Sequence, residues 1–139
     1  MTTALARPTL VDTSGWVEFL RATGSAVDRS LAEALDAARS LWTTGVVLQE
    51  VLQGARTPAQ ARDLRLMLGA CTAVEPLFPD TYEHAAALYD RCRRAGRSVR
   101  GTMDCLVAAV ALEHGLAVLG TDRDLVTLRD VCGLALVHA

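Results

Sequence analysis

The sequence predicts an α/β fold, in which helices cover both faces of a central parallel sheet of about four or five short strands. Short apolar runs alternate along the chain with longer segments of helical periodicity. These runs are apolar at successive positions, as expected for strands that are buried on both faces. The 139 residues, 51% hydrophobic and 22% charged, are enough for one substantial core. We therefore expect a single domain over residues 1–139.

The first half of the chain is expected to alternate between strands and helices. Thr9, Leu10 and Val11 form an apolar run that ends at Asp12, which predicts a buried strand followed by a turn. Gly54 stands where a helix end favours a left-handed residue. The expected elements are a strand at 9–11, helices at 16–21 and 26–39, a strand at 41–44 and a helix at 46–53.

Caps and prolines set most of the boundaries expected in the second half. Thr57 and Pro58 are a typical helix start, since threonine caps the N-terminus of a helix and proline fits the first helical position. Asp80 and Thr102 are expected to cap two further helices. The expected elements are helices from 58 to near 69, from the Asp80 cap to near 95 and from 103 to 114, strands at 73–77, 116–119 and 134–137, and a short helix within 121–131.

The composition excludes several classes of enzyme. Lysine is absent, so chemistry that needs a lysine to bind phosphate or to form a Schiff base cannot occur. The net charge of −2 argues against a generally basic surface for nucleic acid, although a local basic patch stays possible. The four cysteines form no C-x-x-C pair, which predicts reduced and mostly buried thiols rather than a zinc site or disulfides. Without a signal peptide or a long apolar run, the protein is expected to be cytoplasmic and to make no membrane contact.

Five acidic residues stand among apolar neighbours or directly after predicted strands. Asp12 ends the first strand, and Asp122 and Asp124 follow the strand at 116–119. Glu50 lies inside an apolar helix and Asp104 in the first turn of another. Because the carboxyl ends of parallel strands meet at one edge of a sheet, we expect Asp12 and Asp122 to meet there, with Asp104 facing them.

Gathered carboxylates need a counter-charge, because an isolated buried charge costs several kcal/mol. Either arginine or a metal ion can supply it, and an all-oxygen ligand set suits Mg²⁺ or Mn²⁺ rather than zinc. Simpler interpretations stay open for single residues. Asp12 can cap a helix, Asp104 can be a favourable charge at a helix N-terminus, and Glu50 can share an exposed stripe with Gln53.

Four short segments follow one another in a distinctive order. They are Leu10-Val11-Asp12-Thr13-Ser14 followed by Trp16, Val46 to Gly54, Met103 to Ala109, and Gly120 to Leu125. In this order and spacing they resemble the PIN-domain ribonucleases, and among them the VapC toxins of bacterial toxin–antitoxin pairs. The resemblance covers nearly the whole chain and implies a PIN-like three-layer α/β/α sandwich.

The resemblance also implies a Mg²⁺-dependent endoribonuclease, in which Mn²⁺ can substitute. Its catalytic residues map onto Asp12, Glu50, Asp104 and Asp122, and its metal ligands onto Asp12, Asp104, Asp122 and Asp124. We expect Asp12 and Asp104 to hold the metal directly. Glu50 and Asp122 would complete the shell, position water or act as base, so that metal-activated water attacks an RNA phosphodiester.

Two positions of the last segment depart from the family pattern. Leu125 stands in place of an aromatic residue, and Gly120 stands where a threonine is common, although Thr121 is adjacent. The fourth acidic residue is therefore either Asp122 or Asp124. We favour Asp122 because it lies closer to the end of the strand.

Five arginines occur within ten residues just before Asp104: Arg91, Arg93, Arg94, Arg97 and Arg100. They are expected to contact RNA phosphates, or else to be a solvated helix end whose charges complement the helix dipole. Because aromatic residues are scarce, recognition is expected to depend on RNA shape rather than on stacked bases. His84, His114 and His138 show no metal-binding spacing and are expected to be structural or exposed.

The resemblance further implies a VapB-type antitoxin, whose tail fills the acidic groove, and a homodimer. Trp16, Phe19 and Leu20 are candidates for either contact, or for the core. The alternative function is a catalytically silent PIN-like module that binds RNA or protein, and the retained acids argue against it. A metal-dependent DNA nuclease is a third possibility, but such relatives usually carry long insertions for which this chain has no room.

Overall fold

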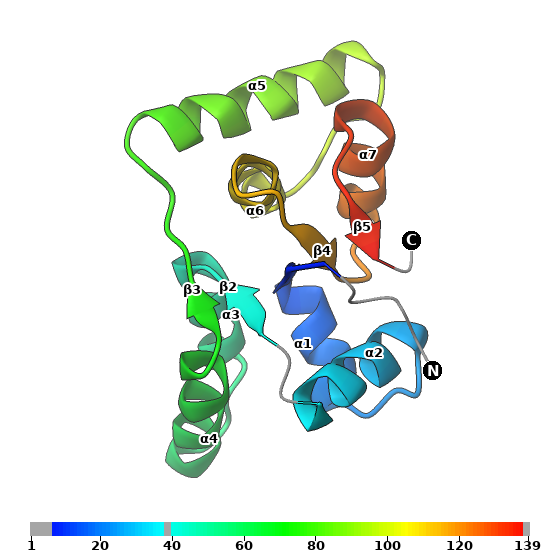
Figure 1. The fold of residues 1–139 in the computed structure, drawn as a ribbon. Helices are drawn as coiled ribbons and strands as arrows, with labels where there is room; N and C mark the ends of the chain where they lie inside the picture. Colours follow the sequence, from blue (N-terminus) through cyan, green and yellow to red (C-terminus); the bar gives the residue numbers. More distant parts are fainter. Residues whose placement is uncertain (1–6, 38–39, 138–139) are drawn as a thin grey trace.

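A five-stranded parallel sheet forms the centre of the fold, which was obtained as a computed structural model describing residues 7–37 and 40–137. The strand order is β3-β2-β1-β4-β5 (Figure 1), so β1 and β4 are neighbours in the middle of the sheet. The prediction of an α/β fold with a parallel sheet is confirmed. The strands are β1 (Thr9–Val11), β2 (Leu41–Thr43), β3 (Thr72–Ala73), β4 (Ala117–Leu119) and β5 (Leu136–Val137).

Helices flank this sheet in two groups (Figure 1). Helices α5, α6 and α7 pack against one another, and α1 packs against both α2 and α3, with α4 beside α3. None of the helices within 7–37 and 40–137 is long and apolar enough to cross a membrane. The helices are α1 (Thr13–Leu20), α2 (Ala26–Asp36), α3 (Gly45–Gln53), α4 (Pro58–Gly69), α5 (Asp80–Arg94), α6 (Thr102–Glu113) and α7 (Arg123–Cys132).

The register of the central strands brings two turns together. Val11 pairs with Leu119, the last residue of β4, so β1 and β4 end at the same edge. The Asp12 backbone N–H continues the ladder by donating to the Leu119 carbonyl at 3.0 Å. Helix α1 then starts so close to β4 that a Cβ on Gly15 would lie 2.7 Å from the same carbonyl oxygen. A side chain at position 15 would therefore push α1 away from the edge of the sheet that carries Asp12.

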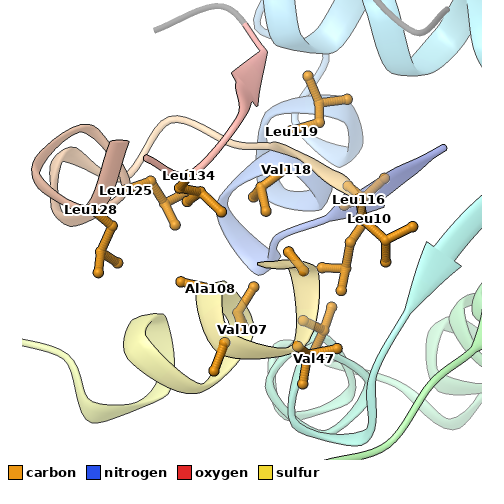
Figure 2. Packing of buried hydrophobic residues seen from close by; sticks show 14 of the residues in the cluster. Leu10, Val47, Val107, Ala108, Leu116, Val118, Leu119, Leu125, Leu128 and Leu134 are labelled. Atoms are coloured by element: carbon orange, nitrogen blue, oxygen red, sulfur yellow. The ribbon is translucent and has the colours of Figure 1, made fainter. Parts of the chain in front are cut away.

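The core lies on both faces of the central strands. Leu10, Val11, Val118 and Leu119 are fully buried. Figure 2 shows Val118 on the side of α6 and Leu119 on the opposite side, as the alternation of a strand requires. Three apolar residues were expected to belong either to a partner contact or to the core. Trp16 is fully buried, Phe19 is partly buried, and Leu20 is 46% exposed.

Several predicted boundaries were wrong. The strand expected at 73–77 stops at Ala73, because Pro76 has no N–H and the Glu75 carboxylate turns to accept the Gly45 N–H at 2.6 Å. Gly54 is not left-handed: its φ is −82°, because α3 ends in short-range bonds from Gly54 N–H to the Val51 carbonyl.

Two predicted caps were also wrong. Pro79 and Gly101 hold the cap positions of α5 and α6, and neither offers a side-chain cap. Asp80 and Thr102 instead form the first helical residues. The first turn of α5 is fixed differently, since the Leu77 N–H donates to the Thr81 hydroxyl at 2.9 Å. The helix predicted to reach 39 is described only to Asp36, and positions 38 and 39 lie outside the described residues.

Candidate active site

A cleft of about 270 Å³ opens at the carboxyl edge of the central strands. Besides Glu18, it brings together four acids that are far apart in the sequence: Asp12, Glu50, Asp104 and Asp122. Asp12 follows β1, and Asp122 lies in the turn between β4 and α7. Glu50 comes from the middle of α3, and Asp104 from the first turn of α6. Thr13, Ser14 and Thr121 also line the cleft.

Asp124 joins this group from the first turn of α7. One carboxylate oxygen from each of Asp104, Asp122 and Asp124 lies within 4.8 Å of the others. None of the five acids forms an ion pair with an arginine or histidine anywhere in residues 7–37 and 40–137. Carboxylate oxygens at this spacing, without a basic side chain to offset them, are a suitable donor set for a hard divalent cation.

Burial and the negative charges of the cluster raise the pKa values of two of its carboxyl groups. Burial, followed by the charges of Asp12, Asp122, Asp124 and Glu50, raises the pKa of Asp104 to about 8. The pKa of Asp12 is also raised, because the effect of burial exceeds the opposing effect of its hydrogen bonds to Ser14. Both shifts describe the chain without a cation, and a bound cation would favour the ionised carboxylates.

Asp12 is both a helix cap and a member of the cluster. Only 4% of its surface is exposed. Its Oδ2 accepts the Ser14 N–H at 3.1 Å, which caps α1, and the Ser14 hydroxyl at 2.6 Å. The simpler interpretation of Asp12 as a cap is therefore confirmed, and the same carboxylate also lines the cleft.

Glu50 is held from the neighbouring helix. The Thr13 hydroxyl donates to Glu50 Oε1 at 2.8 Å. Glu50 is half-buried and lines the cleft, so it does not belong to an exposed stripe with Gln53. Thr13 and Ser14 belong to the segment that carried the family resemblance, but no sequence pattern indicated their separate contacts to Glu50 and Asp12.

Asp122 and Asp124 differ in their surroundings. Asp122 lines the cleft, while its Oδ1 accepts the Asp124 N–H at 2.9 Å and caps α7. Asp124 is buried, and its Oδ2 accepts the N–H groups of Arg100 and Gly101 at 3.0 and 3.2 Å. Asp124 thus fixes the chain just before α6, and so the place of Asp104, while Asp122 faces the open space.

The two departures from the family pattern lie in contact with each other. Leu125 is fully buried in the core. A Cβ on Gly120 would lie 2.9 Å from Leu125 Cδ1 and 2.7 Å from Ser14 Oγ. A threonine at position 120 therefore does not fit this arrangement of side chains.

Most of the arginines between 91 and 100 are held by other side chains. Arg93 and Arg94 both bond Asp90 and thereby lower its pKa. Arg97 bonds Asp130 at 2.8 Å, and Arg91 donates to the Val131 carbonyl at 3.1 Å. In the described part of the chain, the Arg100 guanidinium makes none of these ion pairs.

The histidines and cysteines of the described residues lie outside the cleft. His84 Nδ1 lies 2.8 Å from Glu113 Oε2, and His114 Nδ1 lies 3.0 Å from the Val110 carbonyl. His138 lies outside the described residues. All four cysteines are free thiols, of which Cys92 and Cys105 are buried and Cys71 and Cys132 are partly buried.

A second, larger hollow of about 580 Å³ adjoins the cleft. It runs along α1, α3 and α4, and Val17 and Glu50 line both spaces. Most of its lining is apolar, with charged side chains from Arg21, Arg56 and Asp63.

Comparison with known proteins agrees with this geometry. Residues 9–132 match the PIN domain family. The chain belongs to the PIN domain family. Ribonuclease VapC11 of Mycobacterium tuberculosis is 36% identical to this PIN domain over 119 residues, which cover 83% of this chain and 87% of that protein.

Solved structures share the fold of this PIN domain. The VapBC2 structure from Rickettsia felis, bound to a promoter DNA fragment, aligns with a TM-score of 0.71 and 13% identity over 94% of this chain and 97% of that one. VapBC-5 from Mycobacterium tuberculosis aligns with a TM-score of 0.68 and 25% identity over 96% and 100%. The resemblance to the PIN-domain ribonucleases and to VapC toxins is therefore confirmed.

Proposed function

We propose that this PIN domain is the toxin of a toxin–antitoxin pair and acts as a metal-dependent endoribonuclease. The observation that carries the proposal is the cleft lined by Asp12, Glu50, Asp104 and Asp122, none of which is paired with a basic side chain within residues 7–37 and 40–137. The ribonuclease names of its relatives at 36% identity support the choice of RNA as substrate.

The acidic residues would have different roles in this reaction. Asp12, Asp104 and Asp122 would hold a divalent cation, Mg²⁺ or, in its place, Mn²⁺. When bound, such a cation lowers the pKa of water and offsets charge that develops on a phosphate. Glu50 is oriented by Thr13 and can accept a proton from water at the cleft. Asp124 adds its charge while it keeps α6, and hence Asp104, in place.

RNA would reach the cleft past the segment that precedes α6. In this proposal Arg91, Arg93, Arg94, Arg97 and Arg100 contact its phosphates. The structure supports unequal contributions, because Arg93 and Arg94 share the charge of Asp90 and Arg97 pairs with Asp130, whereas the Arg100 guanidinium forms no ion pair with any described residue.

An antitoxin would bind along the 580 Å³ hollow between α1, α3 and α4. The apolar lining suits one face of a helix, and the shared Val17 and Glu50 lead from it into the acidic cleft. A VapB-type partner lying there would block the acids. The homodimer and the cytoplasmic location stay predictions of the same proposal.

Cleavage of total RNA by the purified chain tests the function. We expect discrete fragments with Mg²⁺ or Mn²⁺ and none with EDTA. Asp104→Asn should reduce the rate by about 100-fold or more, since it removes a charge from the cluster. Asp36→Asn, an exposed acid at the end of α2, is the matched control and should cleave as the wild type does.

Two results would contradict the proposal. Equal cleavage by Asp104→Asn and by the wild type would place the activity elsewhere or in a contaminant. Folded protein without antitoxin that cleaves no RNA at any metal concentration would favour the silent binding module.

A further inference from the structure

Ser14 joins the two turns that carry the acids. Its hydroxyl donates to Asp12 Oδ2 at 2.6 Å and accepts the N–H groups of Thr121 and Asp122 at 2.9 and 3.3 Å. A hydroxyl has one donor and two acceptor positions, so all three are used. One oxygen atom thus connects the end of β1 with the turn between β4 and α7.

This role differs from helix capping. The cap of α1 is the bond from the Ser14 N–H to Asp12 Oδ2, and that bond does not need the hydroxyl. Both bonds from Ser14 go to Oδ2, so the hydroxyl adds a second bond to the oxygen that caps α1. The hydroxyl therefore fixes the direction of the Asp12 carboxylate and its distance from Asp122.

Gly120 provides the room for this bridge. A Cβ at position 120 would lie 2.7 Å from Ser14 Oγ and 3.0 Å from Asp12 Cβ. Gly120 is not among the glycines with a positive φ, so space rather than backbone conformation explains the glycine. Any side chain there would displace the Ser14 hydroxyl or Asp12 itself.

We propose that Ser14 is a positioning residue that sets the affinity of the cleft for a divalent cation, and that Gly120 is required to admit its hydroxyl. The inference rests on the proposed function, since it assumes a cation between Asp12 and Asp122. Hydrogen-bond partners of metal-binding side chains typically contribute about 10- to 100-fold to metal affinity. We expect an effect of that size here.

Mn²⁺ binding measured without RNA tests the proposal. The loss of the free Mn²⁺ electron paramagnetic resonance signal gives the Kd of the full chain. Ser14→Ala and Gly120→Ala should each weaken binding by about 10- to 100-fold. Ser25→Ala is the matched control, because its hydroxyl accepts a backbone N–H at the start of α2, away from the cleft. It should bind Mn²⁺ as the wild type does.

Kinetics and stability distinguish positioning from general damage. Ser14→Ala should raise the Mn²⁺ concentration needed for half-maximal RNA cleavage, while saturating Mn²⁺ restores most of the maximal rate. Its unfolding temperature should match that of Ser25→Ala within about 4 °C. Ser14→Thr, which keeps a hydroxyl, should retain most of the Mn²⁺ affinity.

The outcomes separate this inference from the proposed function. Unchanged Mn²⁺ affinity in Ser14→Ala, alongside lost affinity in Asp104→Asn, would overturn the role of Ser14 and leave the metal-dependent ribonuclease intact. Equal weakening in Ser14→Ala and Ser14→Thr would also overturn it, since the hydroxyl would not be the cause. A wild-type chain that binds no Mn²⁺ would overturn both proposals.

Discussion

The carboxyl group of Asp104 lies in surroundings that oppose its ionisation. With a folded-state pKa of about 8 against an ordinary value of 3.8, the folded chain keeps a proton that the unfolded chain has lost. The stability that this proton supplies is complete below pH 3.8 and disappears as the pH rises through about 8. Without a divalent cation, the unfolding temperature should therefore be lower at about pH 8.5 than at about pH 5.5.

Thermal unfolding in EDTA at these two pH values is the measurement, with Asp104→Asn beside the wild type. The variant should show a smaller fall in unfolding temperature, because its amide does not titrate. Saturating Mg²⁺ should restore stability at high pH, since a ligand of the folded state alone stabilises it. An identical fall in the variant would show that Asp104 is not the group responsible.

Single residues differed in how far the sequence could predict them. Glu50 and Asp104 were predictable because a charged residue among apolar neighbours needs a reason to be there. Ser14 and Gly120 were not, since serine and glycine are ordinary residues in turns. What distinguishes them is contact at long range, such as the bond between Ser14 and Thr121, which are 107 positions apart.

Among the elements, the types were predictable and the boundaries less so. The type of an element is indicated by the hydrophobic period and apolar character of many residues, whereas its boundary depends on a few local hydrogen bonds. β3 is the clearest case: a strand was predicted over 73–77, but it ends at Ala73, and the Glu75 side chain turns toward Gly45. A contact with another element, invisible in the local sequence, decided the length of the strand.

The arginines in the last turn of α5 and in the chain that joins it to α6 allow a prediction at the same scale. Arg100→Ala should weaken RNA binding more than Arg94→Ala, because Asp90 already bonds Arg94 and offsets its charge. The dependence of binding on salt concentration should also fall by about one ion for Arg100→Ala and by less for Arg94→Ala. Binding to a labelled RNA in EDTA across a salt series measures both. Equal effects would show that the ion pairs of α5 open when RNA binds.

The arrangement of the whole molecule explains why distant acids meet. In the order β3-β2-β1-β4-β5, the two central strands end side by side, and the turns after them carry Asp12 and Asp122. The rule that ligands bind beyond the carboxyl ends of parallel strands predicted this meeting. Strand order itself was not predictable from the sequence pattern, since every strand is a short apolar run and pairing depends on how the helices cross over.

The hollow beside the cleft leads to a prediction for the whole molecule and its partner. Leu20 lines that hollow and is 46% exposed, so Leu20→Glu places a charge on the apolar surface proposed to receive the antitoxin. Co-purification with a co-expressed VapB-type antitoxin should drop by about tenfold or more, as expected for a charge buried unpaired in an interface. Leu66→Glu on α4 is the control, because Leu66 is 70% exposed and does not line the hollow. Both variants should cleave RNA as the free wild-type chain does. Loss of the partner in both, or in neither, would place the antitoxin on another face.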